Sequence, residues 1–173
     1  MVWKMASLST TKTLVLDSDM KIMDIFVAVS ALPPPINYPI DVVFVVDESE
    51  SVGSENFTTT KSFLSQFISR LDIDSGNTRV GLVTFATNVT TVINLTDHSS
   101  VASLQSAISS LSYTGGSTAN TAVALDYVRT RMLTEEAGDR DNVHNIVVVI
   151  TDGRSDNVSA TMVSTKSAAF LYC

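Results

Sequence analysis

The sequence predicts an α/β fold with a doubly wound, mostly parallel sheet, one antiparallel edge strand and helices on both faces. Two apolar runs rich in β-branched residues, "VVFVV" at 42–46 and "IVVVI" at 146–150, have the composition of strands that are covered on both sides. Between these runs, apolar residues at helical spacing alternate with further strand-like segments. Alternation of this kind is typical of a sheet whose connecting helices pack against both of its faces.

The first half of the predicted fold contains three strands and one helix. After the strand at 42–46, Ser54 is well placed to cap a helix. The segment at 79–87 forms the second strand, and the segment at 90–96 follows it after a turn so short that these two strands must be antiparallel. The apolar stripe expected of the helix consists of Phe57, Thr60, Leu64, Phe67, Ile68 and Leu71.

The second half adds two helices, a strand and a final helix. One helical stripe contains Val101, Leu104, Ile108 and Leu111, and another runs from Thr121 to Met132. The segment at 145–153 repeats the pattern of the first strand, and the acidic run at 134–141 before it is expected to be a solvated helix end. The complete order is therefore β-α-β-β-α-α-β-α.

Composition limits the function classes. The 173 residues are 45% hydrophobic and carry a net charge of −7, which fits one globular domain and disfavours nucleic acid or an anionic membrane surface as a partner. Cations and basic partners fit this charge better. Cys173 is the single cysteine, so an intrachain disulfide is impossible.

Residues 1–38 differ from the rest and are predicted to be a disordered or loosely docked leader to a domain at 39–173. Their apolar stretch "KIMDIFVAVSAL" is interrupted by Asp24 and followed by three prolines. It is too short and too acidic to cross a bilayer, and it lies too late in the chain to be a good signal peptide. We therefore expect no membrane insertion by this segment.

Oxygen-bearing side chains follow the first and the last of the predicted strands. "DESES" (47–51) comes after the first strand, and Thr151, Asp152 and Gly153 come after the last. Ligands of doubly wound sheets bind at the carboxyl ends of the strands, so these two segments are expected to line one crevice. Oxygen ligands without clustered cysteine or histidine select a hard cation such as Mg²⁺, Ca²⁺ or Mn²⁺.

Asp47, Ser49 and Ser51 alternate along an extending loop, so all three side chains can turn toward one ion. One carboxylate and two neutral hydroxyls would leave the ion able to accept a further carboxylate. The alternative is that Ser49 and Ser51 cap the following helix while Asp47 accepts hydrogen bonds from its backbone N–H groups. The residues alone leave both interpretations open.

Four segments in order resemble the von Willebrand factor A domain of extracellular matrix and adhesion proteins. They are "DVVFVVDESESVGSENF", "RVGLVTFA", "GGSTANTAVALDYV" and "NIVVVITDGRSDN", and the resemblance covers roughly residues 39–168. It implies a Rossmann-like fold with a metal-ion-dependent adhesion site (MIDAS). Carried over by position, the ligands are Asp47, Ser49, Ser51, a threonine of the glycine-led loop, and Asp152 acting through water.

Two departures from the family pattern affect this site. The loop "GGSTANTAVAL" is one residue longer than the common Gly-Gly-x-Thr-x-Thr-Gly-x-Ala-Leu form. Counting forward from its glycines selects Thr118, the ligand that we favour, whereas counting back from the leucine puts Ala119 there, with Thr121 as the next threonine. Glu50 replaces a glycine common in the family and adds a carboxylate at the rim.

The resemblance implies an extracellular adhesion or matrix-binding module and not an enzyme. The domain would hold Mg²⁺ or Mn²⁺, and a Glu or Asp of a protein partner, possibly a matrix protein such as collagen, would complete the coordination sphere. The sequons at Asn56, Asn88, Asn94 and Asn157 give weak support for secretion. One alternative is a metal-free structural domain. Another is a Mg²⁺-dependent phosphohydrolase, but "DESES" lacks an Asp two residues after Asp47, and no lysine lies close to the last strand, Lys166 being the nearest.

The resemblance also implies that the domain is incomplete at its C-terminus. The sheet of the family continues after the next helix with another parallel strand and a terminal helix, and nothing after Ala169 matches either. The strand at 146–150 is therefore expected to lie at or near an uncovered edge, which would favour pairing with another chain.

Overall fold

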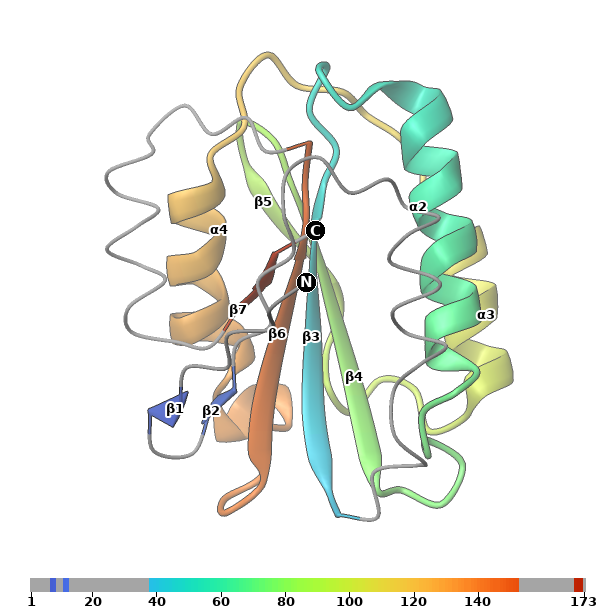
Figure 1. Cartoon of the computed structure of the whole chain (residues 1–173), viewed down its shortest axis with the longest axis vertical. Helices are drawn as coiled ribbons and strands as arrows, with labels where there is room; N and C mark the ends of the chain where they lie inside the picture. The colour runs from blue at the N-terminus through green and yellow to red at the C-terminus, as the bar shows by residue number, and fades with distance from the viewer. Residues whose placement is uncertain (1–6, 9–10, 13–37, 153–169, 173) are drawn as a thin grey trace.

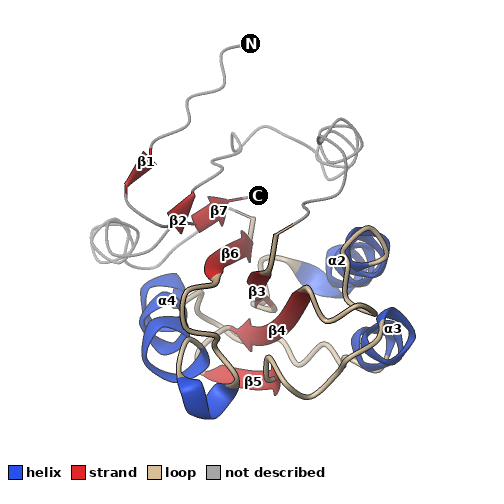
Figure 2. Ribbon diagram, turned by 90° about the horizontal axis from the view of Figure 1, so that it is seen from below, coloured by secondary structure: helices blue, strands red, loops and turns tan. Residues whose placement is uncertain are grey.

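The computed structural model describes residues 7–8, 11–12, 38–152 and 170–172. Its centre is a five-stranded sheet with helices on both sides (Figure 1, Figure 2). The strand order is β5-β4-β3-β6-β7. The bounds are β3 Ile40–Asp47, β4 Thr78–Phe85, β5 Val89–Ile93, β6 His144–Ile150 and β7 Phe170–Tyr172.

Only one pair within this sheet is antiparallel. β4 and β5 run in opposite directions, whereas β3 is parallel to both β4 and β6, and β6 is parallel to β7. The predicted doubly wound sheet with an antiparallel edge is therefore confirmed. Of the predicted leader, the structure describes a separate antiparallel pair, β1 (Ser7–Leu8) and β2 (Thr11–Lys12).

β6 was expected at or near an uncovered edge, and it lies one strand from the edge because β7 pairs with part of it. Val147, Val148 and Val149 pair in parallel with the three residues of β7. An apolar strand presents unpaired N–H and C=O groups at its edge, and a short late segment of the same chain satisfies some of them here. This pairing does not test whether the domain is incomplete, which stays a prediction. The helix expected after β6 lies outside the described residues.

β3 is buried on both faces because its side chains alternate between two apolar clusters. Val42, Phe44 and Val46 belong to the cluster that includes residues of α2 (Gly53–Ile68) and α3 (Val101–Ser109). Val43 and Val45 belong to the cluster on the other face, with α4 (Thr121–Tyr127) and the π-helical turn that continues it to Met132. Figure 2 shows these helix layers on opposite sides of the sheet. The continuous apolar run of β3 therefore reflects two-sided burial.

The predicted cap of the first helix is wrong by two residues. Val52 occupies the N-cap position of α2 without a side-chain hydrogen bond, and Ser54 lies within the first turn. The backbone N–H of Val52 donates to the carbonyl of Ser49, so a turn leads the chain into the helix before Ser54 is reached. The predicted apolar stripe is otherwise largely buried, with Phe57, Thr60, Leu64 and Ile68 among its buried residues.

A buried ion pair joins the start of β3 to the loop before β6. The side chain of Asp41 is fully buried, and the Arg140 guanidinium donates to it from Nε at 2.9 Å and from Nη2 at 2.7 Å. Arg140 also donates to the backbone carbonyls of Ile40, Gly76 and Asn77. The expectation of a solvated acidic helix end at 134–141 is therefore wrong at this arginine, which packs into the base of the sheet.

Asp139 provides a test of pH dependence beside this pair. Burial raises the pKa of its carboxyl above the ordinary 3.8, and the carboxylates of Asp41 and Asp141 raise it further. A raised carboxyl pKa means that the native state binds the proton more tightly than the unfolded state. The free energy of unfolding therefore falls as the pH rises from the ordinary carboxyl pKa through the raised one. We expect Asp139→Asn to raise the melting temperature at about pH 8 and to leave it unchanged below about pH 4. Equal shifts at both pH values would contradict this expectation.

Candidate metal centre

The candidate centre lies where the chain switches from one face of the sheet to the other. From β3 the chain reaches β4 through α2, while its other neighbour β6 is preceded by α4 on the opposite face. The carboxyl ends of β3 and β6 therefore meet beneath the loop that leads into α2, at the top of Figure 1. The carboxyl ends of strands at such a switch point are the usual ligand sites of doubly wound sheets.

Asp47 ends β3 and is held from two sides. The backbone N–H of Ser49 donates to its Oδ1 at 2.9 Å, and the hydroxyl of Thr151 donates to its Oδ2 at 2.7 Å. The residue is only 2% exposed. The contact with Thr151 confirms that the segments after β3 and β6 lie together at this edge of the sheet, as expected for neighbouring parallel strands.

The hydroxyls of Ser49 and Ser51 lie 3.1 Å apart. Neither caps α2, because its N-cap residue is Val52 and receives no side-chain hydrogen bond. The helix-capping interpretation is therefore wrong for both serines, although Asp47 does bond to the backbone N–H of Ser49. Tyr113 fixes the same turn by donating its hydroxyl to the carbonyl of Ser49 at 3.1 Å. The three predicted side chains thus belong to one tethered turn.

The electrostatics of Asp47 favour a cation. Burial raises the pKa of its carboxyl, and the nearby carboxylate of Asp152 raises it further, against the lowering effect of hydrogen bonds from Ser49 and Thr151. The ion pairs formed among the described residues are Arg129–Asp126 and Arg140–Asp41, and neither includes Asp47. A positive ion would therefore supply charge compensation that these ion pairs do not.

The glycine-led loop packs directly against this turn. The backbone N–H of Glu50 donates to the carbonyl of Gly116 at 2.8 Å. A side chain at Gly116 would not fit, because its Cβ would lie 2.6 Å from the Cβ of Ala86. The missing side chain lets the loop approach the β4–β5 turn closely, and so places the loop beside the residues that follow Asp47.

The threonines of this loop point to different surroundings. The hydroxyl of Thr118 donates to the hydroxyl of Thr87 at 3.0 Å in the β4–β5 turn. Thr121 is fully buried at the start of α4, and its hydroxyl has no hydrogen-bond partner among the described residues. Ala119 lies between them and is 6% exposed. Within the described part of the chain, neither threonine forms a hydrogen bond with Asp47, so the choice of loop ligand stays a prediction.

The donor set fits a hard divalent ion with partly neutral ligands. Carboxylates of Asp47 and Asp152 and hydroxyls of Ser49 and Ser51 are oxygen donors. Within the described ranges, no three histidine, cysteine, aspartate or glutamate side chains form a metal-binding group. An ion at this position would therefore depend on hydroxyls and water as well as on the carboxylates. Asp152 and Glu50 are exposed, at the solvent side of the centre.

Three residues at the centre were not among the predicted ligands. Thr151 belongs to the motif that ends β6 and orients Asp47, so its position was visible in the sequence although its role was not. Tyr113 and Thr87 hold the two loops, but they lie far from Asp47 along the chain, and no spacing pattern indicates them.

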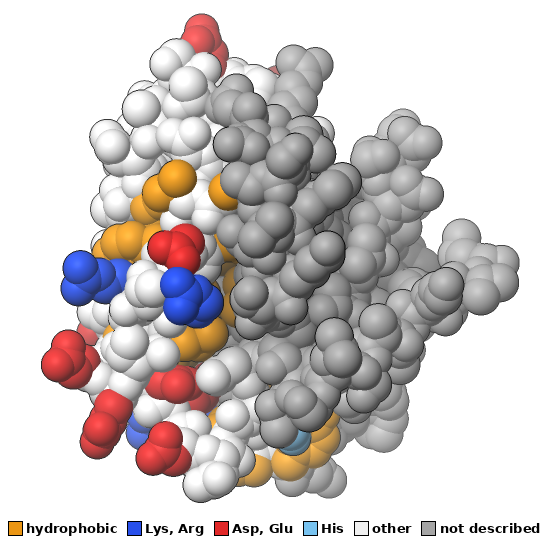
Figure 3. Space-filling view, turned by 90° about the vertical axis from the view of Figure 1, so that its left-hand side faces the viewer, with side chains coloured by type: hydrophobic (Ala, Val, Ile, Leu, Met, Phe, Trp, Pro, Cys, Tyr) orange, Lys and Arg blue, Asp and Glu red, His pale blue; other side chains and the backbone are white. Residues whose placement is uncertain are grey.

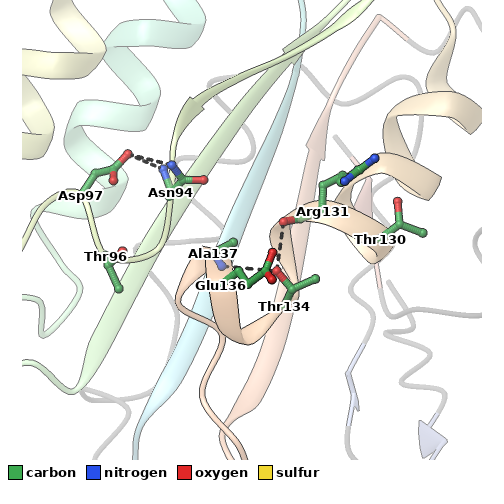
Figure 4. A pocket seen from close by; sticks show the side chains of 8 residues that line it. All are labelled: Asn94, Thr96, Asp97, Thr130, Arg131, Thr134, Glu136 and Ala137. Carbon is green, nitrogen blue, oxygen red and sulfur yellow. Dashed lines mark hydrogen bonds between the residues drawn. The ribbon is translucent and has the colours of Figure 1, made fainter.

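A separate polar hollow lies between the end of β5 and the turns after α4 (Figure 4). Its volume is about 380 Å³, and Arg131 lies on one side of it while Asp97 lies on the other. The remaining lining residues are Asn94, Thr96, Thr130, Thr134, Glu136 and Ala137. None of the predicted ligands lines this hollow. Among the described residues that Figure 3 shows in colour, acidic and basic side chains are mixed, unlike the basic surface typical of nucleic-acid binding.

Comparison with known proteins gives several similar sequences. The collagen alpha-4(VI) chain of Mus musculus is 40% identical over 121 residues, covering 69% of this chain and 5% of that protein. The von Willebrand factor A domain-containing protein 2 of Xenopus laevis is 42% identical over 116 residues, covering 67% and 15%. Matrilin-2 of Mus musculus is 38% identical over 125 residues, covering 70% and 13%. The chain thus spans a small part of each relative.

Solved structures support the fold. Proximal thread matrix protein 1 from the mussel byssus superposes with a TM-score of 0.74 at 17% identity, covering 81% of this chain and 38% of that one. Another structure of that protein, described with a zinc-occupied MIDAS motif, gives a TM-score of 0.70 at 18% identity, covering 80% and 38%. Identities this low establish similarity of fold alone.

The family model of the von Willebrand factor type A domain matches residues 41–170, a range that includes both loops of the candidate centre. Because this match extends over more than half of the sequence, the chain belongs to the von Willebrand factor type A domain family.

Proposed function

We propose that this chain is an extracellular adhesion or matrix-binding module that holds a divalent cation and binds an acidic side chain of a protein partner. Asp47, Ser49 and Ser51 would hold the ion, with Thr118 from the glycine-led loop and with Asp152 through water. The ion is Mg²⁺, or Mn²⁺ in its place. Similarity to matrilins and to a collagen VI chain supports a partner in the matrix, such as a collagen.

The observation that supports this proposal most is the buried carboxylate of Asp47, which lies beside two serine hydroxyls that do not cap a helix. Both of its oxygens accept hydrogen bonds, and its pKa is raised by burial and by Asp152. A carboxylate kept at such an electrostatic cost is more easily explained by a cation than by packing. Neutral hydroxyl ligands leave the ion with enough positive charge to attract a carboxylate of the partner.

The surroundings affect which partners can approach. Glu50 is exposed on the same turn, and the chain carries a net charge of −7, so an acidic partner meets repulsion except at the ion itself. Binding should therefore depend strongly on the ion.

No helix within the described residues has the length and apolar character needed to cross a membrane.

The test is to measure melting and partner binding in the presence and absence of the ion. We expect Mg²⁺ or Mn²⁺ to raise the melting temperature of the full chain and chelator to reverse the rise, because an ion that binds the folded state stabilises it. Binding to immobilised collagen should require the same ions and should be lost in chelator. A melting temperature unaffected by Mg²⁺, Mn²⁺ or Zn²⁺ would contradict the proposal.

The loop ligand can be identified by two matched substitutions. We expect Thr118→Ala to weaken the metal-dependent rise in melting temperature, because this threonine is partly exposed and can turn from Thr87 toward the ion. Thr121→Ala removes a buried hydroxyl that has no hydrogen-bond partner among the described residues, and it should leave the metal response unchanged. The reverse pattern would identify Thr121 as the ligand. Indifference at both positions would indicate that Ala119 takes the ligand place and that water replaces the hydroxyl.

A metal-free interaction domain is the second candidate. It is favoured by the hydrogen bond that engages Thr118 with Thr87 and by the buried methyl group of Ala119 at the alternative ligand place. In that case, partner binding would survive chelation. A phosphohydrolase is less favoured, since the residues around Asp47 offer hydroxyls rather than a lysine for phosphoryl charge.

A further inference from the structure

Three Asn-x-Ser/Thr sequences lie within the described residues, and their asparagines have different surroundings. Asn56 lies in the first turn of α2, where its Nδ2 donates to the carbonyl of Val52 at 2.8 Å. Asn94 donates from Nδ2 to Asp97 at 3.3 Å beside the polar hollow of Figure 4. The side chain of Asn88 is exposed and makes no hydrogen bond to another described residue. Asn88 therefore has the least engaged amide of the three.

The turn that carries Asn88 is well suited to a large substituent. Its backbone is fixed, since the N–H of Ala86 donates to the carbonyl of Asn88 at 3.0 Å. Thr90, the third residue of the sequence motif, is also exposed, at the start of β5. β5 is one of the two edge strands of the five-stranded sheet. A group attached to Asn88 would thus extend from a rigid hairpin at the sheet edge.

The same turn also holds the glycine-led loop, which packs against the turn that follows Asp47. Thr87 accepts a hydrogen bond from Thr118 on its hydroxyl and another from Nδ2 of Asn120 on its carbonyl, each at 3.0 Å. The carbonyl of Ala86 accepts the backbone N–H of Asn120 at 3.1 Å. Asn88 is therefore one residue away from the contacts that hold the glycine-led loop.

We propose that Asn88 carries an N-linked glycan that stands at the rim of the candidate metal centre and restricts which partners reach it. This inference rests on the extracellular location in the proposed function, because N-glycosylation takes place in the secretory pathway. A glycan at this position excludes broad, flat partner surfaces and admits a narrow one, such as an extended segment that presents a single carboxylate.

The modification is a glycosyl transfer from a lipid diphosphate-linked oligosaccharide. A bond forms between Nδ2 of Asn88 and C1 of the first sugar, and the bond between C1 and the donor's phosphate oxygen breaks. The amide nitrogen loses one proton, and the lipid diphosphate is the leaving group. Nothing is oxidised or reduced. Thr90 supplies the hydroxyl that the acceptor motif requires.

The first experiment maps the glycan on the full chain secreted from a eukaryotic cell. We expect mass spectrometry to find the peptide that contains Asn88 glycosylated, and expect enzymatic release to leave Asp at that position. Asn88→Gln and Thr90→Ala should remove this glycan, while Thr90→Ser retains the motif and should keep it. Asn56→Gln and Asn94→Gln are the matched controls and should leave it in place. Secreted protein with unmodified Asn88 would overturn the proposal.

The second experiment measures shielding with a thiol placed in the loop. Ser117 is exposed between Gly116 and Thr118, and Ser117→Cys in a Cys173→Ser background gives one reactive thiol. We expect a long polyethylene glycol maleimide to label it several-fold faster after glycan release, and a small maleimide to label it at an unchanged rate. Equal acceleration of both reagents, or of neither, would overturn the shielding role.

The glycan at Asn88 and the proposed metal function can be tested independently. The metal-dependent rise in melting temperature can be measured on protein from bacteria, which lacks this glycan. Loss of that rise with the glycan present at Asn88 would contradict the proposed metal function alone. A normal metal response with Asn88 unmodified in the secreted protein would contradict the glycan alone.

Discussion

Replacing Arg140 by Ala is expected to lower the free energy of unfolding by about 3–5 kcal/mol, the usual cost of leaving one member of a buried ion pair alone. The carboxylate of Asp41 is fully buried and accepts three hydrogen bonds from Arg140, one of them from its backbone N–H. The substitution removes the guanidinium and leaves the charge of Asp41 uncompensated. It also removes the donors to three backbone carbonyls at the base of the sheet.

Arg129 provides the matched control for this experiment. Its ion pair with Asp126 lies on the surface, with side chains that are 55% and 61% exposed. Arg129→Ala should therefore change the stability by no more than about 0.5 kcal/mol. Chemical denaturation of both variants measures the difference directly. Similar small losses in the two variants would show that Arg140 does not stabilise the junction between β3 and the loop before β6.

Replacing Asp47 by Asn is expected to lower stability in the presence of the ion but not in its absence. In chelator, the substitution removes a buried carboxylate whose pKa is raised, so the melting temperature should rise or stay constant at neutral pH. The amide oxygen can still accept the N–H of Ser49. With Mg²⁺ at about 100 times its dissociation constant, the unsubstituted chain should gain about 2.7 kcal/mol that the variant lacks.

In melting temperature, that gain corresponds to a rise on the order of 5–10 °C for a chain of this size. Asp47→Ala should abolish it equally, and Ser49→Ala should reduce it. Asp126→Asn, a surface carboxylate on α4, is the control and should keep the full metal response. A full metal response in Asp47→Asn would remove the adhesion-site interpretation and leave the metal-free domain.

The sequence was most informative where burial and topology impose a pattern. β3 and β6 were predictable because strands covered on both faces need continuous β-branched runs, and their pairing follows from the parallel topology. The contact between Asp47 and Thr151 follows in turn, since neighbouring parallel strands end at the same edge. The family model confirms the recognition of the domain from its four motifs.

Features that depend on three-dimensional proximity were not predictable. Ser54 has the chemistry of a helix cap, but the turn from Ser49 to Val52 starts the helix earlier. The ion pair between Asp41 and Arg140 joins two residues that lie far apart in the sequence, and no local pattern distinguishes this arginine from a solvated one. The extra residue of the glycine-led loop left two possible alignments of this loop with the family motif. The contact of Thr118 with Thr87 depends on how closely Gly116 approaches the β4–β5 turn.

The position of β3 at the centre of the sheet also affects how the chain folds. Its face toward α2 and α3 can be covered largely by residues 53–109, which follow it closely, and its pairing with β4 closes a much shorter loop than its pairing with β6. Its face toward α4 and its pairing with β6 wait for residues 121–150. Distant pairings form late because chain entropy must be lost first. During synthesis we therefore expect Val43 and Val45 to stay exposed to solvent longer than the residues that face α2 and α3. A chain stalled at that stage would present an apolar sheet face to chaperones or to other nascent chains.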